Sequence, residues 1–270
     1  MAEKSSPVQS LDRAFDIMER LCAARDGLPI HTLTELTGLH KSTVHRMLAA
    51  MASRGYVRKD EDTGRYRMTT RLYALSGQVV ENLDLVQVAR VPMEHLRDEV
   101  GETVHLVVPE GSDIVYVHKV EAEAGAIRMF SRIGMRRPMY CTGVGKAILA
   151  SMADEEVDEI WVQSDIHAYT EHTIVTRERL QDVLDAIRRR GCAFDNEENE
   201  LGVRCIAAAI YDYSGKVCGA LSISAPLIRM SDSYLAGLQP HLMEARDQIS
   251  RAMGWMGEAG RPQFARKNRI

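Results

Sequence analysis

Residues 34–68 read TELTGLHKSTVHRMLAAMASRGYVRKDEDTGRYRM. Gly38 is expected to turn the chain between two helices, and Gly55 is expected to end the second helix. Two short basic runs then surround a polar turn that ends in Gly64, which predicts a β-hairpin. Helix, turn, helix and hairpin in this order are typical of a winged helix-turn-helix domain, which presents its second helix to the major groove of DNA.

The second helix of this stretch, predicted over residues 41–54, separates an apolar face from a polar face. Val44, Met47, Leu48 and Met51 recur at the helical spacing and predict the buried stripe. The opposite face carries side chains that can contact base edges and phosphates, and the hairpin adds basic side chains for phosphates. A winged helix that binds another protein is the alternative, but the basic hairpin favours DNA. The expected DNA-contacting residues are Lys41, Ser42, Thr43, His45, Arg46, Arg58, Lys59, Arg65 and Arg67.

Charge is distributed unevenly along the chain. The 270 residues carry a net charge of −4, but residues 1–71 hold 12 basic and 9 acidic side chains, and the last ten residues add +4. Residues 72–260 therefore carry −11. An acidic body with a basic head repels DNA except at the head, which helps to orient a complex.

The cysteine pattern and the lack of targeting segments predict a protein of the reducing cytoplasm. The five cysteines show no Cys-x-x-Cys spacing, so neither a disulfide framework nor a zinc ribbon is indicated. The N-terminal residues lack an apolar signal-peptide core, and no run approaches the roughly 18 apolar residues that a membrane span needs. We therefore expect no secretion and no membrane association.

The hydrophobic periodicity predicts an α+β chain with an antiparallel sheet. The head is expected over residues 8–70, a linker helix over 71–84, an effector-binding domain over 85–254 and a basic, disordered tail over 255–270. Ser10 and Thr32 are the expected N-caps of the first two helices. Further helices are predicted at 86–100, 143–152, 154–162, 176–190 and 231–253, and strands at 103–109, 114–120, 126–132, 205–211 and 217–224.

Three patterns suggest chemistry other than DNA binding. Residues 142–147, TGVGKA, resemble a phosphate-binding loop but lack its first glycine and its final Ser or Thr, which excludes nucleotide hydrolysis. Their glycines could still let a helix N-terminus approach a small anion. Cys141 or Cys205 with a histidine base would make an enzyme, but no catalytic signature surrounds either cysteine. The histidine spacing does not suit a metal, so we expect no metal and no cofactor.

Three motifs in the body are recognisable. They are YCTGVGKA over residues 140–147, ELGVRCIAA over 200–208 and GALSIS over 219–224. Together with the helix-turn-helix stretch, and in this order, they resemble the IclR family of bacterial transcriptional regulators from about residue 8 to residue 253. In the last motif Ser222 and Ser224 share one strand face, which would be either the solvent side or a polar pocket.

The resemblance implies a ligand-responsive regulator, more often a repressor, of a catabolic operon. It further implies a GAF-like effector domain, a homodimer or homotetramer, and a double-stranded DNA operator as the partner. By motif, the effector pocket would be lined by Met129, Gly143, Val144, Asp195, Val203, Cys205, Ser222 and Ser224.

Residues 127–134, IRMFSRIG, and 138–142, PMYCT, further resemble the subgroup that senses 2-keto-3-deoxygluconate. The implied effector is a small carboxylate such as a sugar acid. Backbone N–H groups at Gly143 and Val144 with the two serine hydroxyls would suit the carboxylate, and Asp195 would take a hydroxyl or a carbonyl hydrate. Arg128 or Arg132 would supply a cation for the acid. Arg136 and Arg137 lie nearby, and the alternative for each of the four arginines is a place on the surface.

Overall fold

The computed structural model describes residues 8–81, 84–122 and 131–257. The chain divides into two compact units, the first ending at residue 83 and the second beginning at residue 84. Among the described residues no helix is both long and apolar enough to cross a membrane.

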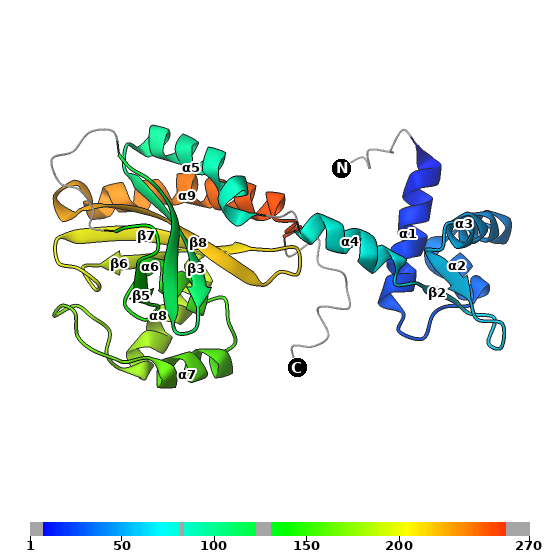
Figure 1. Ribbon diagram of the computed structural model, residues 1–270, viewed down its shortest axis with the longest axis horizontal. Coiled ribbons are helices and arrows are strands. Elements are labelled where there is room, and N and C mark those ends of the chain that lie inside the picture. Colours follow the sequence, from blue (N-terminus) through cyan, green and yellow to red (C-terminus); the bar gives the residue numbers. More distant parts are fainter. Residues whose placement is uncertain (1–7, 82–83, 123–130, 258–270) are drawn as a thin grey trace. The chain divides into compact units, whose positions relative to one another are not determined.

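The first unit is a winged helix-turn-helix, as predicted (Figure 1). Its two strands pair antiparallel, with Val57 opposite Met68. Gly38 has φ 66°, a left-handed conformation that favours glycine, and it ends the helix before the turn. Its elements are α1 (Gln9–Ala23), α2 (Ile30–Thr37), α3 (Lys41–Ser53), β1 (Val57–Lys59), β2 (Tyr66–Met68) and α4 (Arg71–Glu81).

The core of this unit fixes the orientation of α3. Val44 and Leu48 of α3 are fully buried against Ile17 of α1 and Leu33 of α2. Each Leu or Ile side chain removed from water in this way contributes about 1.5–3 kcal/mol. The predicted apolar stripe of the second helix is therefore the face that packs inward, and its polar face is left outside.

The predicted starts of the first two helices are wrong. α1 begins at Gln9, so Ser10 lies inside the helix and caps nothing. α2 begins at Ile30 after Pro29, and Thr32 also lies inside. The reason is that Pro29 has a backbone conformation suited to a helix start, and Ile30 packs on the core, so packing extends the helix beyond the local cap signal.

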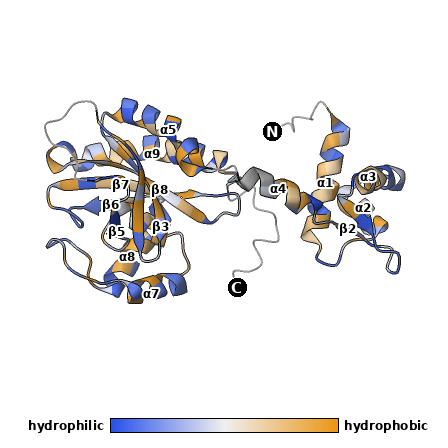
Figure 2. Cartoon of the chain, in the orientation of Figure 1, coloured by the Kyte–Doolittle hydropathy of each residue, from blue (hydrophilic) through white to orange (hydrophobic). Residues whose placement is uncertain are grey.

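The second unit is a six-stranded antiparallel sheet in the order β5-β4-β3-β8-β7-β6. Helices α5 and α9 cover one face, and α6, α7 and α8 lie on the other (Figure 1). In Figure 2 the central strands are largely hydrophobic, whereas α5 and α7 alternate hydrophobic with hydrophilic residues, as helices with one buried face do. The helices are α5 (Leu85–Val100), α6 (Gly143–Leu149), α7 (Asp154–Gln163), α8 (Arg177–Arg190), α9 (Asp232–Ala252) and the 3-10 turn η1 (Leu227–Arg229). The strands are β3 (Thr103–Glu110), β4 (Asp113–Val120), β5 (Arg136–Pro138), β6 (Ala193–Asn196), β7 (Val203–Tyr211) and β8 (Val217–Pro226).

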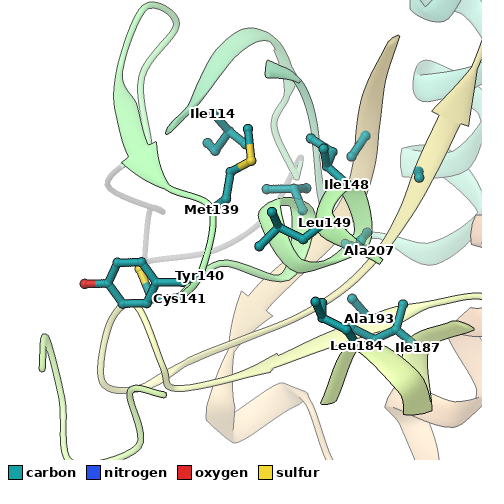
Figure 3. Close-up of a cluster of buried hydrophobic side chains, with 14 of the residues drawn as sticks. Ile114, Met139, Tyr140, Cys141, Ile148, Leu149, Leu184, Ile187, Ala193 and Ala207 are labelled. Atoms are coloured by element: carbon teal, nitrogen blue, oxygen red, sulfur yellow. The ribbon is translucent and has the colours of Figure 1, made fainter. Parts of the chain in front are cut away.

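Helix α6 is fully buried between the sheet and α8 (Figure 3). Ile148 and Leu149 of α6 pack with Leu184 and Ile187 of α8 in one cluster. Strands β6, β7 and β8 contribute only small buried side chains to this cluster, Ala193, Ala207, Ala209 and Ala220. Because these side chains are only methyl groups, α6 lies close to the strands.

Two parts of the predicted sheet need correction. Residues 126–130 of the expected third strand lie outside the described residues, and residues 131–132 are not in a strand. The strand beside β4 is instead β5, and β6 was not predicted at all. Both strands have only three or four residues, too few to show an alternating pattern. Within the expected tail, residues 258–270 lie outside the described part of the chain.

Candidate functional site

The outer face of α3 is the first candidate surface. Lys41, Ser42, His45 and Arg46 are exposed, and Thr43 is half-buried. The same helix buries its apolar stripe, so these side chains are held on a helix that is fixed by packing rather than on a mobile loop. The arrangement can contact phosphates and base edges of a duplex.

The hairpin beside α3 adds three exposed basic side chains, Arg58, Lys59 and Arg65. Lys59 lies 3.8 Å from Glu61, and Arg65 Nη1 donates to the Gly27 carbonyl at 3.3 Å. Arg67 lies opposite Arg58 in the ladder but is half-buried, and its buried Nε has no hydrogen-bond partner. Of the four predicted wing cations, Arg67 is the one least open to a phosphate.

A polar row crosses the second unit on the face that α6 covers. Asp195 of β6 lies opposite Cys205 of β7, which lies opposite Ser224 of β8. Directly opposite residues of an antiparallel pair share one face, so the three side chains stand side by side. All three are buried.

This row forms one wall of a cavity of about 40 Å³, room for a few water molecules. Residues from all six strands of the sheet and from two connecting segments surround it. They are His105, Tyr116, Ser131, Met135, Arg137, Asp195, Asn199, Glu200, Val203, Cys205 and Ser224.

The structure brings together only part of the predicted effector set. Asp195, Val203, Cys205 and Ser224 line the cavity. Gly143 lies at its edge, because a Cβ there would be 2.9 Å from the Cys205 sulfur and 3.3 Å from the Asp195 Cβ.

The other predicted effector residues lie elsewhere. Val144 of α6 is buried in the hydrophobic cluster and does not line the cavity. Ser222 sits deeper in the same strand, with its Oγ 3.5 Å from that of Ser224. Both serines are buried, so their shared face is not the solvent side. Met129 lies outside the described residues.

Sequence reasoning missed His105, Tyr116 and Asn199 as lining residues. His105 is fully buried and contacts Tyr116 edge-on, with ring centroids 5.3 Å apart. Its Nε2 lies 2.7 Å from the Ser131 hydroxyl. The available signal was a histidine within the apolar run of residues 103–109, while Asn199 gave no signal because it lies in an irregular segment.

Burial determines the protonation of this site. Burial, together with the smaller effect of the Lys119 charge, lowers the pKa of His105 to about 3, so the ring is neutral at physiological pH. Burial raises the pKa of the Tyr116 hydroxyl; Cys205 and Asp195 raise it further, and Arg137 opposes them. Burial raises the pKa of Asp195 to about 6, against the attraction of Lys146.

The two candidate nucleophiles are poorly suited to catalysis. Burial raises the pKa of the Cys141 thiol to about 12 and raises that of Cys205 strongly as well. A thiol must ionise to attack, so both cysteines are inert at neutral pH. Among the described residues no group of three His, Cys, Asp or Glu side chains is placed to hold a metal ion.

A buried ion pair lies directly behind the polar row. Lys146 of α6 donates to Glu198, and both residues are buried. The Glu198 backbone N–H in turn donates to Asp195 Oδ1 at 2.8 Å. In the first turn of α6 the Gly145 N–H donates to the Thr142 hydroxyl at 3.1 Å, so this N–H is already occupied. The ion pair therefore connects α6 to the segment that borders the cavity.

Comparison with known families identifies both units. Residues 10–61 match the IclR helix-turn-helix domain, and residues 77–251 match the family described as bacterial transcriptional regulator IclR C-terminal. The chain belongs to the IclR family.

Relatives within the IclR family place the chain more closely. It is 37% identical to the HTH-type transcriptional regulator KdgR of Escherichia coli over 92% of this chain and 94% of that protein. It is 35% identical to the E. coli DNA-binding transcriptional repressor YiaJ over 94% of this chain and 91% of that protein. The crystal structure of the C-terminal domain of E. coli KdgR is 38% identical, with a TM-score of 0.59 over 64% of this chain and all of that one.

These findings confirm the predicted family and class of function. The chain is a KdgR-like member of the IclR family, a ligand-responsive DNA-binding transcriptional regulator and not an enzyme. Its partners are therefore operator DNA and a ligand of the effector-binding domain.

Proposed function

We propose that this regulator represses a catabolic operon as a homo-oligomer and that a sugar acid, such as 2-keto-3-deoxygluconate, binds in the cavity of the second unit. The cavity carries the proposal because it combines a cationic side chain, Arg137, with hydrogen-bonding groups such as Asp195 and Ser224. An acid with hydroxyl groups needs both kinds of partner. We expect the protein to act in the cytoplasm, where it can reach operator DNA.

The proposed DNA contacts are the predicted residues of α3 and the wing. The exposed side chains of Lys41 and Arg46 are suited to phosphates and guanine edges, and Ser42 and His45 offer hydrogen bonds beside them. Two copies of the head would read half-sites about 34 Å apart, or a multiple of this spacing, on one side of the duplex.

Exposed apolar side chains on α1 support the proposed oligomer. Leu11 and Phe15, four residues apart on one face of the helix, are 51% and 52% exposed. These two side chains lie next to each other on the helix surface. In a dimer that binds a two-fold operator, the pair on one head could pack against the same pair on the other head. A measurement of molecular mass in solution distinguishes a dimer from a tetramer.

The small cavity suggests how a ligand acts. A six-carbon acid is larger than about 40 Å³ allows, so it would displace lining side chains as it binds. A ligand shifts a regulator only by the difference in its affinity for the two states. The displacement that binding requires is a source of that difference.

The test is selection of genomic fragments by the purified protein, with and without a panel of sugar acids. We expect a few intergenic fragments to bind and one acid to release them. Arg46→Ala should weaken operator binding and reduce its dependence on salt without changing ligand binding. Ser224→Ala should weaken the response to the acid and leave operator binding intact.

Arg90→Ala serves as the control, because Arg90 is exposed on α5, outside the head. It should change neither activity. Specific fragments that ignore every acid would overturn the effector, and equal effects of Arg46→Ala and Ser224→Ala on both activities would overturn the assignment of residues.

A further inference from the structure

Arg137 differs from the other arginines of its segment. It lies on the edge strand β5, where it is paired with Ile114 of β4, and it lines the cavity. Among the described residues Arg137 has no ion pair, and its Nη1 donates a long hydrogen bond of 3.5 Å to the Arg136 carbonyl. A half-buried guanidinium beside a cavity, with no carboxylate of its own, is free to bind an anion.

The neighbouring arginines do not meet these conditions. Arg136 alternates with Arg137 along the strand, so its side chain points to the opposite face. There it lies 2.9 Å from Glu110 and 3.2 Å from Asp113. Arg132 is exposed and does not line the cavity, and Arg128 lies outside the described residues.

Acceptor groups line the same cavity from β6 and the segment after it. Asp195 is buried there, and the buried Asn199 Oδ1 has no hydrogen-bond partner. A buried acceptor without a partner calls for a donor from a ligand or water. Tyr116 lies within reach of both charges, since Arg137 lowers the pKa of its hydroxyl and Asp195 raises it.

We propose that Arg137 binds the carboxylate of the effector, and so restricts the effector to acids, while Asp195 and Asn199 accept hydrogen bonds from its hydroxyl groups. The assignment rests on the proposed function, because it places a sugar acid in this cavity. The negative charges around the cavity are the reason for assigning the carboxylate to Arg137. Asp195 and Glu200 line the site and would repel an acid unless a cation opposed them. Lys146 cannot replace Arg137, because it is bound to Glu198 and does not line the cavity.

The test is calorimetric titration of the full chain with 2-keto-3-deoxygluconate and with its uncharged primary amide. Wild type should bind the acid more tightly than the amide. Arg137→Gln, which removes the charge but keeps a polar side chain, should lower affinity for the acid about 10- to 100-fold and leave affinity for the amide unchanged. Arg137→Lys should recover only part of the loss, because an ammonium cannot form the two parallel hydrogen bonds of a guanidinium.

Arg136→Gln is the matched control, one residue away on the opposite face, and should leave both affinities unchanged. The unfolding temperature and operator affinity of each variant show whether the fold is intact. If Arg137→Gln weakens the acid and the amide equally, or weakens neither, the role of Arg137 is wrong while the sugar-acid proposal stands. If wild type binds neither compound, the proposed effector class fails and the assignment of Arg137 fails with it.

Discussion

The buried pair between Lys146 and Glu198 makes a strong prediction about stability. The Lys146 side chain is 1% exposed and that of Glu198 is 11% exposed. Glu198→Gln leaves the lysine charge in the interior without its counter-charge, and breaking a buried pair in this way costs about 3–5 kcal/mol. For a domain of this size about 1 kcal/mol moves the unfolding midpoint by 2–4 °C, so the effector domain should melt roughly 6–20 °C lower.

Scanning calorimetry of four proteins tests this reasoning. They are wild type, Glu198→Gln, Lys146→Met and the double variant Lys146→Met/Glu198→Leu. The double variant should recover most of the lost stability, because two apolar side chains replace two charges that needed each other. Lys146→Met should lose stability over a wider pH range than wild type, from about 4 to beyond 6, because it removes the positive charge that lowers the pKa of Asp195 in the folded state.

An exposed pair supplies the control. Arg20 and Asp16 lie 3.3 Å apart on α1, with side chains 43% and 39% exposed. Asp16→Asn should change stability by less than about 0.5 kcal/mol, because solvent screens such pairs. If Glu198→Gln costs no more than this control, or if the double variant costs the sum of the two single variants, the buried pair is not the interaction described here.

Three further variants test other features of the second unit. Wild type should lose stability as pH rises from about 4 to 6, because the pKa of Asp195 is about 6 in the folded state and 3.8 ordinarily. Asp195→Asn should remove this loss, and melting temperatures measured across this pH range would show it. Gly145→Ala should prevent folding or destabilise by several kcal/mol, since its Cβ would lie 2.3 Å from the Met139 carbonyl oxygen, and urea unfolding would show this. Gly237→Ala, in an exposed turn of α9 with nothing within 4 Å, should instead stabilise by about 0.5–1 kcal/mol in the same assay.

The head could be predicted from the sequence because its signals are local. The stripe of Val44, Leu48 and Met51 repeats with the helical period, Gly38 marks the end of α2, and Gly55 follows the end of α3. The cap predicted at Thr32 was wrong for a physical reason. Side-chain capping competes with packing, and α2 begins at Ile30, which is partly buried against the core. Local sequence patterns therefore predict the helices and the hairpin, whereas tertiary contacts determine the residues at which the helices begin.

The cavity could be predicted only in part. Asp195, Cys205 and Ser224 were found through a family resemblance, yet their alignment in one row depends on the register of three strands. The sequence favoured Arg128 or Arg132 as the cation and offered Arg137 only as a nearby arginine, and its place on the short strand β5 separates it from Arg136. Periodicity cannot reveal a three-residue strand, so no amount of local reasoning would have ranked these arginines.

The small side chains under α6 limit how this protein can change over evolutionary time. Gly145 on the helix leaves no space for an added methyl group without movement of the Met139 backbone, and Gly143 leaves none without movement of the Cys205 side chain. A mutation there must be matched by a second one, which makes single steps costly. New ligand preferences are therefore more accessible at the rim of the cavity, where Met135 and Glu200 are not tightly enclosed. The close packing under α6 is therefore constrained, whereas the residues at the rim of the cavity can vary.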